Sequence, residues 1–190
     1  MSTEGKPFRP PVLVGGIHMV TLETERLTLR MWRESDFEQH AAICADPEVM
    51  RFLGEGKPLS RFDAWRHMAM LVGHWHLRGY GHWAVEEKAS GRLLGRVGFF
   101  NPEGWPGFEL GWTLGRQYWG RGYATEAARR ALGYAFTEMG KARVISLIDP
   151  GNKASIKVAE RLGEREEGKA EVFGKEVIVY GIDRGAWPSA

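Results

Sequence analysis

The sequence predicts a single mixed α/β domain, and three observations support that prediction. Segments with the periodicity of strands alternate along the chain with segments that have the periodicity of helices. No repeat, low-complexity segment or linker divides the chain into halves. Its 190 residues, 43% hydrophobic and 26% charged, are enough to bury a substantial core in one soluble domain.

The first third of the chain predicts one strand followed by helices. Apolar and polar residues alternate over residues 26–31, as they do in a half-buried strand. Ser35 and Asp36 offer a helix cap, so we expect a short helix over residues 37–44 and a further helical turn over 48–53.

A longer helix is expected from Ser60 to Gly79. Ser60 and Asp63 have the spacing of a capping box, with aspartate in place of the usual glutamate, and Gly79 is suited to end the helix. The apolar residues expected to share one side of this helix are Phe62, Trp65, Ala69, Val72 and Trp75.

The rest of the chain predicts hairpins and two more helices. Residues 82–86 and 93–100 have strand patterns and are joined by a turn at 89–91. The remaining expected elements are a strand over 108–114, a helix over 123–139, a strand over 143–148, a helix over 155–162, and a final hairpin from 171–173 and 176–182.

The two ends of the chain are expected to lie outside the domain. We expect a flexible N-terminal extension over residues 1–19, the domain over 20–184 and a short C-terminal tail over 185–190. The extension holds only a brief apolar stretch, unlike a signal peptide, and Met19 is a second possible start.

Net charge, apolar runs and the cysteine count limit the partners and the cellular compartment that we expect for this protein. The net charge of +2 gives no reason to expect nucleic acid or a membrane as a partner, and no apolar run approaches the roughly 20 residues that span a bilayer. Cys44 is the only cysteine, so no intramolecular disulfide can form. A cytoplasmic protein is the expectation.

The segment from Glu109 to Glu126 is the most informative part of the sequence. An apolar strand is followed by a glycine-rich loop that carries arginines, and then by an alanine-rich helix. Backbone amides at a helix start form an anion site, and glycines let that backbone approach a phosphate closely. The loop lacks the Gly-Lys-Ser/Thr of nucleoside triphosphate sites and the spacing of dinucleotide sites. It therefore predicts a different phosphorylated cofactor.

This loop, Gln117-x-x-Gly120-x-Gly122-x-Ala124, resembles the acyl-CoA pyrophosphate loop of the GNAT superfamily of N-acetyltransferases. Residues 118–127 resemble its branch named for RimJ and RimL. Further matches follow in the expected order at Thr24–Arg30, Asp46–Met50, Asn152-x-x-Ser155 and Glu160–Gly163. The resemblance implies a single GNAT-like domain with a central, mostly antiparallel, splayed sheet flanked by helices, and acetyl-CoA as co-substrate.

The resemblance also implies which residues bind the cofactor. They are Gly111, Trp112, Thr113 and Leu114 on the strand, Gln117, Tyr118, Trp119, Gly120, Arg121, Gly122, Tyr123 and Ala124 in the loop and helix start, and Asn152. Several have a plain structural alternative. Gly111 can be a packing glycine, Asn152 a helix N-cap, and Arg121 a solvated side chain. Lys153 and Lys157 share a helix face that meets either the 3′-phosphate of CoA or solvent.

Catalysis requires a base, because an alkyl ammonium has a pKa near 10. Strand alternation puts Glu109 on one face with Gly111 and Thr113, so its carboxylate can act through a water; the alternative is an exposed acid paired with an arginine. Ser155 is the candidate acid for the leaving thiolate, or hydrogen-bonds only to backbone. Ala159 stands where many members of the superfamily have a tyrosine.

The predicted function is acetyl transfer to a primary amine by direct attack in a ternary complex. The acceptor is a protein N-terminus or a small-molecule amine; a CoA-binding sensor without turnover is the alternative. Trp65, Trp75, Trp83 and Trp105 either wall the acceptor site or pack elsewhere, and a homodimer is possible. No metal is expected, because His67 and His74 share a helix face without a nearby acidic third ligand.

Overall fold

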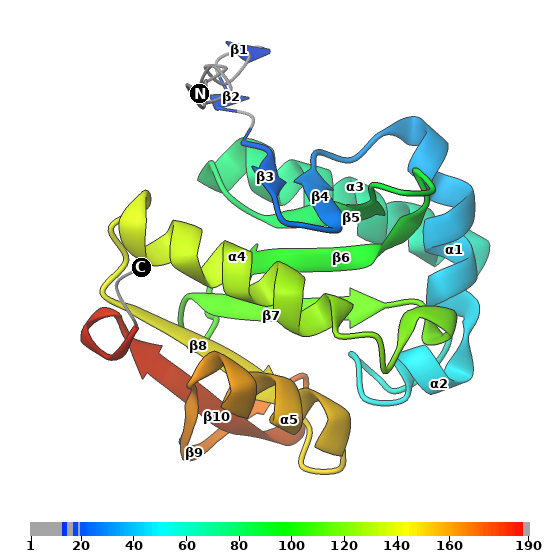
Figure 1. Cartoon of the computed structure of the whole chain (residues 1–190). Coiled ribbons are helices and arrows are strands. Elements are labelled where there is room, and N and C mark those ends of the chain that lie inside the picture. Colours follow the sequence, from blue (N-terminus) through cyan, green and yellow to red (C-terminus); the bar gives the residue numbers. More distant parts are fainter. Residues whose placement is uncertain (1–12, 15–16, 19, 188–190) are drawn as a thin grey trace, which may run out of the picture.

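An eight-stranded sheet forms the centre of the domain in the computed structural model, which describes residues 13–14, 17–18 and 20–187 (Figure 1). In spatial order its strands are β3 (Leu22–Glu23), β4 (Leu27–Arg30), β5 (His82–Glu87), β6 (Leu93–Phe100), β7 (Glu109–Leu114), β8 (Arg143–Ile148), β10 (Lys175–Asp183) and β9 (Arg165–Val172). All neighbours are antiparallel except β7 and β8. The prediction of a mixed α/β domain with a mostly antiparallel sheet is confirmed.

The sheet is split between β7 and β8. These parallel strands share a single register pair, Glu109 opposite Ile145, whereas β6 and β7 pair over their whole common length. Just beyond that pair, the Ser146 hydroxyl donates to the Leu110 carbonyl at 2.8 Å, in place of a backbone partner. The edge of β7 from residue 111 to 114 therefore has no neighbouring strand, as the expected splay requires.

Helices cover both faces of the sheet. They are α1 (Phe37–Ala45), α2 (Pro47–Met50), α3 (Arg61–Arg78), α4 (Tyr123–Thr137) and α5 (Lys153–Leu162). In Figure 1, α4 and α5 lie in front of the sheet and α3 lies behind it. No helix of the described residues is both long and apolar enough to cross a bilayer.

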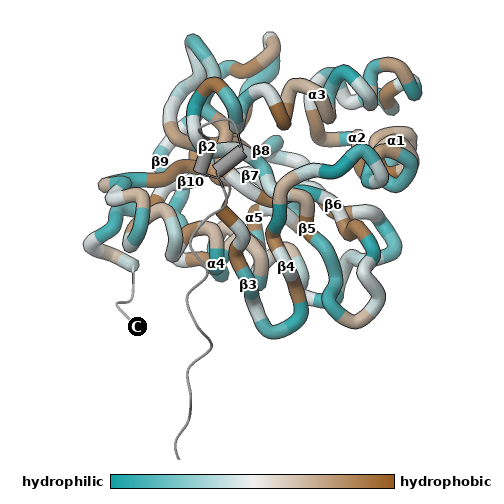
Figure 2. Tube along the Cα trace, turned by 90° about the horizontal axis from the view of Figure 1, so that it is seen from above, coloured by the Kyte–Doolittle hydropathy of each residue, from teal (hydrophilic) through white to brown (hydrophobic). Residues whose placement is uncertain are grey.

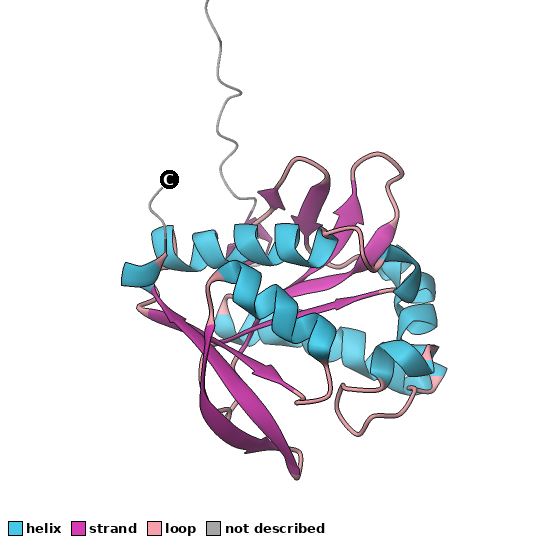
Figure 3. Ribbon diagram, turned by 60° about the horizontal axis from the view of Figure 1, so that its bottom comes forward, coloured by secondary structure: helices cyan, strands magenta, loops and turns pink. Residues whose placement is uncertain are grey.

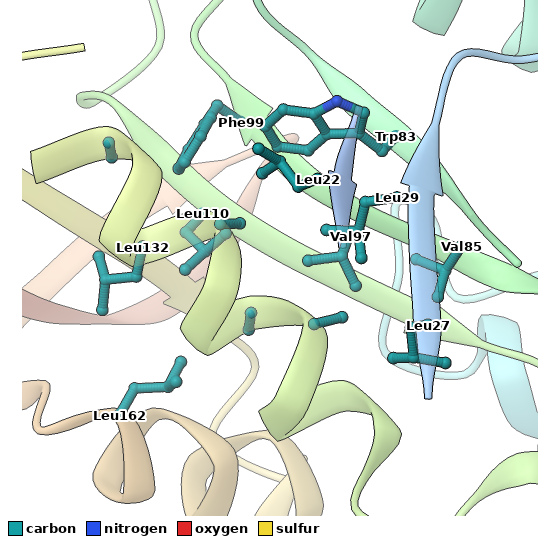
Figure 4. Close-up of a cluster of buried hydrophobic side chains, with 14 of the residues drawn as sticks. Leu22, Leu27, Leu29, Trp83, Val85, Val97, Phe99, Leu110, Leu132 and Leu162 are labelled. Atoms are coloured by element: carbon teal, nitrogen blue, oxygen red, sulfur yellow. The ribbon is translucent and has the colours of Figure 1, made fainter. Parts of the chain in front are cut away.

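The main core lies between the sheet and α4. Alternate residues of the strands, among them Trp83, Val97 and Phe99, are fully buried in one cluster with the α4 residues Ala127 and Ala131 (Figure 4). The small α4 side chains let this helix approach the larger strand side chains closely. Burying each large side chain is worth about 1.5–3 kcal/mol. The opposite face of the same strands is left to form the site.

Helix α3 corrects one prediction. Its cap is confirmed, since the Ser60 side chain accepts a hydrogen bond from the Asp63 amide. The predicted apolar side is wrong except for Trp75: Phe62 and Trp65 are 69% and 54% exposed, and Ala69 and Val72 are exposed too. The buried residues are Ala64, Met68, Leu71, His74 and Trp75. Hydrophobic residues lie along α3 on more than one side (Figure 2), so periodicity alone did not identify the packed face.

Two further expectations changed at helix and strand starts. Asp36 precedes α1, but its side chain does not cap that helix. Instead the buried Asp36 carboxylate pairs with Arg30 at 2.8 Å and accepts a hydrogen bond from the Arg33 amide. Strand β9 begins at Arg165, earlier than predicted. It is an edge strand that pairs with β10 (Figure 3), and its exposed charged residues lack the apolar pattern by which strands were predicted.

Most of the predicted N-terminal extension, residues 1–19, and the last part of the predicted tail, residues 188–190, lie outside the described residues. Leu13–Val14 (β1) and Ile17–His18 (β2) form a short antiparallel pair. At the other end, Arg184–Ala186 forms a 3₁₀ turn, and Trp187 packs 5.9 Å from the ring of Phe136.

Candidate active site

Two cavities open at the split in the sheet. The first cavity, of about 360 Å³, is lined by Glu109 and by the face of β5, β6 and β7 that does not contact α4. The second cavity, of about 550 Å³, is lined by the glycine loop and the start of α5. Both are lined by Phe52, Leu53, Trp112, Thr113, Asn152 and Ser155. The two cavities therefore meet at the open edge of β7.

Glu109 lies in the first cavity, where β7 and β8 last pair. Its carboxylate accepts a hydrogen bond from Trp105 Nε1 at 2.7 Å. Burial raises the pKa of Glu109 to about 7, although the hydrogen bond from Trp105 and the charge of Arg96 favour its ionised form. A carboxyl with that pKa can accept and release a proton near neutral pH.

Gly111 shares the cavity face with Glu109, as strand alternation predicts. A Cβ atom at Gly111 would lie 3.1 Å from Cε1 of His82 and 3.9 Å from Oε1 of Glu109. The space in front of Gly111 is thus filled by the His82 ring, which favours the packing alternative for this glycine. Burial and the nearby Arg96 lower the pKa of His82, so its imidazole is neutral.

The glycine loop presents free backbone amides to the second cavity. At the turn Arg116–Tyr118, the Tyr118 amide donates to the Gly115 carbonyl at 2.9 Å and the Trp119 amide donates to the Arg116 carbonyl at 3.1 Å. These two amides of the loop are therefore already used within the protein. Within the described chain, the amides of residues 120–124 have no protein acceptor, and they surround the start of α4.

Side chains distant in sequence hold this loop in place. Arg26 pairs with Glu126 of α4 at 2.6 Å and donates to the Arg121 carbonyl at 3.1 Å. Thr24 donates to the same carboxylate at 2.5 Å. Sequence reasoning noted Thr24–Arg30 only as a motif. The structure explains it, because these residues fix the start of α4 and the loop before it.

The residues shared by the two cavities include most of the predicted strand and helix positions. The Ser155 hydroxyl accepts a hydrogen bond from Trp112 Nε1 at 3.2 Å, so its own proton is free to be donated. Asn152 caps α5, because its side-chain oxygen accepts from the Ser155 amide at 3.1 Å. The buried Thr113 Oγ1 has no hydrogen-bond partner among the described residues. An unpaired buried hydroxyl at a cavity wall fits a polar ligand there.

Three cations line the second cavity from one side of α5. Lys153, Lys157 and Arg161 are spaced four residues apart and are exposed at this cavity. Leu114, Tyr118, Trp119, Gly120, Gly122, Tyr123 and Ala124 also line it. Neither Gln117 nor Arg121 lines either cavity, so the structure does not bring these two predicted side chains into the site.

Of the four tryptophans proposed for the acceptor site, only Trp105 lines the first cavity. Trp75 and Trp83 are buried and pack edge-to-face with ring centroids 5.1 Å apart. Trp65 lies on the exposed side of α3. Sequence patterns did not distinguish them, because the role of each depends on which elements meet.

His67 has ligand-type neighbours that sequence reasoning missed. His40 Nε2 lies 3.0 Å from His67 Nδ1 and 3.5 Å from Cys44 Sγ, and the three ligand atoms lie within 4.8 Å of one another. His40 and Cys44 come from α1, so the helix face of His67 gave no sign of them. His74 has a packing role: its Nδ1 lies 2.8 Å from the Tyr80 carbonyl oxygen, and its Nε2 accepts from the Asn101 amide.

Comparison with known proteins identifies the class of protein. Residues 26–165 match the family model described as an acetyltransferase (GNAT) domain. The chain is 35% identical to YkkB of Bacillus subtilis (strain 168), over 84% of this chain and 93% of YkkB. The crystal structure of an acetyltransferase from Agrobacterium tumefaciens strain C58 has a TM-score of 0.77 at 31% identity, covering 95% of this chain and 99% of that one. The chain belongs to the GNAT family and is an acetyltransferase.

The name of a further relative states the reaction of that protein. The chain is 32% identical to the FsC-acetyl coenzyme A-N(2)-transacetylase of Aspergillus fumigatus, over 74% of this chain and 61% of that protein. GNAT acetyltransferases as a class use acetyl-CoA.

Proposed function

We propose that this acetyltransferase moves the acetyl group of acetyl-CoA to a primary amine, which attacks directly in a ternary complex. The observation that carries the proposal is the junction of the two cavities. Gly120, Gly122, Tyr123 and Ala124, whose amides have no acceptor among the described residues, line one of them. Glu109 lies in the other, and Ser155 lies where they meet.

The described residues fit acetyl-CoA on three counts. The amides of residues 120–124 and the positive end of α4 suit its diphosphate. The unpaired edge of β7 over residues 111–114 suits the amides of its pantetheine arm, and the Thr113 hydroxyl lacks a partner there. The cations Lys153, Lys157 and Arg161 lie beside the second cavity and suit its 3′-phosphate.

Glu109 is proposed as the general base. When bound, acetyl-CoA supplies an activated thioester carbonyl. The Glu109 carboxylate removes the ammonium proton, directly or through a water, and frees the nitrogen lone pair to attack that carbonyl. We propose that a backbone amide near Trp112, on the free edge of β7, stabilises the oxyanion.

Ser155 is proposed as the acid for the leaving group. As the carbon–sulfur bond breaks, the Ser155 hydroxyl, which accepts a hydrogen bond from Trp112, passes its proton to the thiolate and takes a proton from solvent in return. Ala159, at the position where a tyrosine is common in the superfamily, is fully buried in a cluster with Ile148 and Tyr180. A tyrosine at this position would have to displace that packing. With no tyrosine hydroxyl there, the proposal assigns the acid role to Ser155, which lies at the junction of the two cavities.

We also place the chain in the RimJ/RimL-like branch, on the strength of the Tyr118–Ala127 motif and the bracing of its Glu126 by Thr24 and Arg26. The proposed setting is the cytoplasm. The acceptor is a small amine or a protein N-terminus, and the first cavity, of about 360 Å³, has the volume of a small-molecule site.

An acceptor screen tests the proposal. Purified protein is mixed with acetyl-CoA and a panel of amines and N-terminal peptides, and release of the free thiol is followed. Thiol release that depends on the amine, with the acetylated amine found by mass spectrometry, is the expected result. Tight CoA binding without thiol release against any amine would instead identify a CoA-binding sensor.

A further inference from the structure

Two cations of the described chain line the first cavity: Lys175, which donates to the Gly54 carbonyl at 2.9 Å, and Arg96, to which the proposed chemistry gives no contact with substrate. Arg96 lies on β6, opposite Thr113 of β7, on the same strand face as Gly98 and Phe100. Its only hydrogen-bond partner among the described residues is the His82 ring, with Nη1 3.0 Å from Nδ1 and 3.4 Å from Nε2. Arg96 forms no ion pair in the described part of the chain, so most of its N–H donors remain free.

The surroundings of Arg96 do not balance its charge. His40, His67 and His82 all have pKa values lowered by burial, and the Cys44 thiol has its pKa raised by burial. These groups are therefore neutral near pH 7. Asp36, the acid next to His40, is engaged by Arg30 at 2.8 Å. Glu109 is the acid whose charge acts on Arg96, but it hydrogen-bonds to Trp105 instead, and with a pKa of about 7 it is only partly ionised at neutral pH. A buried guanidinium without a paired anion is costly, so a carboxylate on a ligand would be favoured beside Arg96.

The same charge argues against a metal ion at the neighbouring ligand cluster. His40, Cys44 and His67 have spacing suited to a soft divalent ion. However, the positive charge of Arg96 lowers the pKa of each of these three groups, so it disfavours positive charge on the two imidazoles. A divalent cation placed among them would meet the same repulsion, whereas an anion would be attracted. The part of the first cavity lined by Arg96, His40, Cys44 and His67, here called the inner end, therefore favours a negatively charged ligand.

The distance from Arg96 to Glu109 sets the size of the ligand. Arg96 contacts the His82 ring, and that ring lies beside Gly111, which is next to the Glu109 carboxylate. Following the contacts through Nε2 of His82 and the Cβ position of Gly111, Nη1 of Arg96 and Oε1 of Glu109 are no more than roughly 11 Å apart. An amine held near Glu109 and an acid held by Arg96 can therefore belong to one small molecule.

We propose that the acceptor is a small amine that carries a carboxylate, such as a free amino acid, with its carboxylate bound by Arg96 and its amine directed to Glu109. Phe100, Trp105 and Leu71 also line this cavity and suit an apolar side chain. Arginine matches a carboxylate with two parallel N–H donors, and the neutral imidazoles of His40 and His67 can add hydrogen bonds. This inference rests on the proposed function, since it names the class of acceptor for the same site.

The test compares matched amines with and without the carboxylate. Common L-amino acids, including phenylalanine and leucine, are each assayed against their carboxamides, with phenethylamine as a decarboxylated control. We expect kcat/KM for the better acids to exceed that of their amides by about 10- to 100-fold, as for loss of a charged hydrogen-bond partner. Arg96→Gln should reduce that ratio to near one, chiefly by raising KM for the acid. Arg92→Gln, an exposed arginine just before β6, should preserve it.

Binding without turnover separates this inference from the proposed function. In the presence of CoA, an accepted amino acid should raise the Tm of the wild-type protein but not that of Arg96→Gln. If that variant fails to fold, Arg96→Lys keeps the charge without the fork and should give an intermediate ratio. Amino acids that bind through Arg96 but are never acetylated would leave the carboxylate-binding site standing, and would overturn both the proposed acetyl transfer and the role of these amino acids as acceptors.

Three other outcomes would overturn the inference. One is equal kcat/KM for acids and amides in the wild-type protein. Another is acetylation of neutral peptide N-termini with no response to free amino acids, which would leave the proposed function intact. The third is a Tm raised by zinc chloride and by no amino acid, which would assign the inner end of the cavity to a metal ion.

Discussion

At the scale of single residues, the proposed chemistry depends on the pKa of Glu109. Two effects compete there. Burial in the cavity favours the neutral acid, while the hydrogen bond from Trp105 and the charge of Arg96 favour the carboxylate. Burial is the larger effect, so the pKa rises to about 7. A base at that pKa is half ionised at neutral pH and still basic enough to receive an ammonium proton.

Replacing Glu109 with glutamine should lower kcat by about 10²- to 10⁴-fold, the usual contribution of a general base. The variant should also lose the ionisation near pH 7 from its pH–rate profile, because the group that titrates there is gone. Steady-state rates between pH 5.5 and 9 measure both effects, and CoA affinity serves as the control. A variant with the wild-type pH profile would remove Glu109 as the base.

Trp105→Phe tests the same pKa without touching the carboxyl. Removing the Nε1–H takes away a hydrogen bond that stabilises the ionised form of Glu109. The pKa of Glu109 should then rise, so the acidic limb of the pH–rate profile should move to higher pH while the plateau changes less. The reverse shift, or none, would show that this hydrogen bond does not control the base.

At the scale of elements, the glycine loop and α4 form a rigid unit. Gly120 and Gly122 have φ angles of +75° and +80°, which other residues rarely adopt. Arg26 then ties the carbonyl of the residue between them to Glu126 on α4. The amides of residues 120–124 are thus held in place before any ligand arrives, which lowers the entropy cost of binding one.

Gly120→Val should weaken CoA binding by about tenfold or more, because a β-branched residue at positive φ is strained by 1–3 kcal/mol and will shift the loop. Gly140→Val is the matched control, since Gly140 also has a positive φ, of 65°, and lines neither cavity. Calorimetric titration of both folded variants with CoA gives the comparison. Equal affinities for the two would mean that the loop does not bind the cofactor.

Sequence patterns predicted elements better than they predicted faces. Strand β8 has the predicted bounds, and α5 ends at Gly163 as expected, because local turn chemistry and periodicity determine both. The apolar side of α3 was assigned wrongly, since two stripes of similar hydropathy compete and only packing selects one. The start of β9 was missed because its residues are charged and exposed. Pairing with β10, which a local pattern does not reveal, makes this segment a strand.

At the scale of the whole molecule, the site is made where distant segments meet. The glycine loop and Glu109 could be selected as candidates from the sequence because they lie close together along the chain. The contacts of Arg26 with the loop, of Trp105 with Glu109, of Arg96 with His82 and of Trp112 with Ser155 could not be predicted, since each joins different parts of the chain. One register pair joins β7 to β8, so the fold itself creates the gap between the two halves of the sheet.

Because of its buried ionisable groups, the domain should lose stability both as the pH rises and as the pH falls. Burial raises the pKa of Glu164 to about 8, so the folded state holds a proton that the unfolded state releases, and stability falls as pH rises from about 4.5 to 8. The pKa of His40 is lowered to about 4, so its contribution is lost as pH falls below about 6.5. Stability should therefore peak at mildly acidic to neutral pH.

Glu164→Gln isolates the alkaline side of this dependence. Between pH 6 and 8 the wild-type free energy of unfolding should fall by up to about 1.4 kcal/mol per pH unit for this group, and the variant should lose that slope. Urea denaturation at a series of pH values measures it. A variant with the wild-type slope would contradict the assignment of a raised pKa to Glu164.

A crystal structure of the protein with coenzyme A tests the proposed cofactor site and mechanism most directly. We predict that the diphosphate oxygens accept hydrogen bonds from the amides of residues 120–124, and that the thiol lies at the junction of the two cavities near Trp112 and Ser155. Coenzyme A bound at any other surface, with those amides still facing solvent, would contradict both the cofactor site and the proposed mechanism.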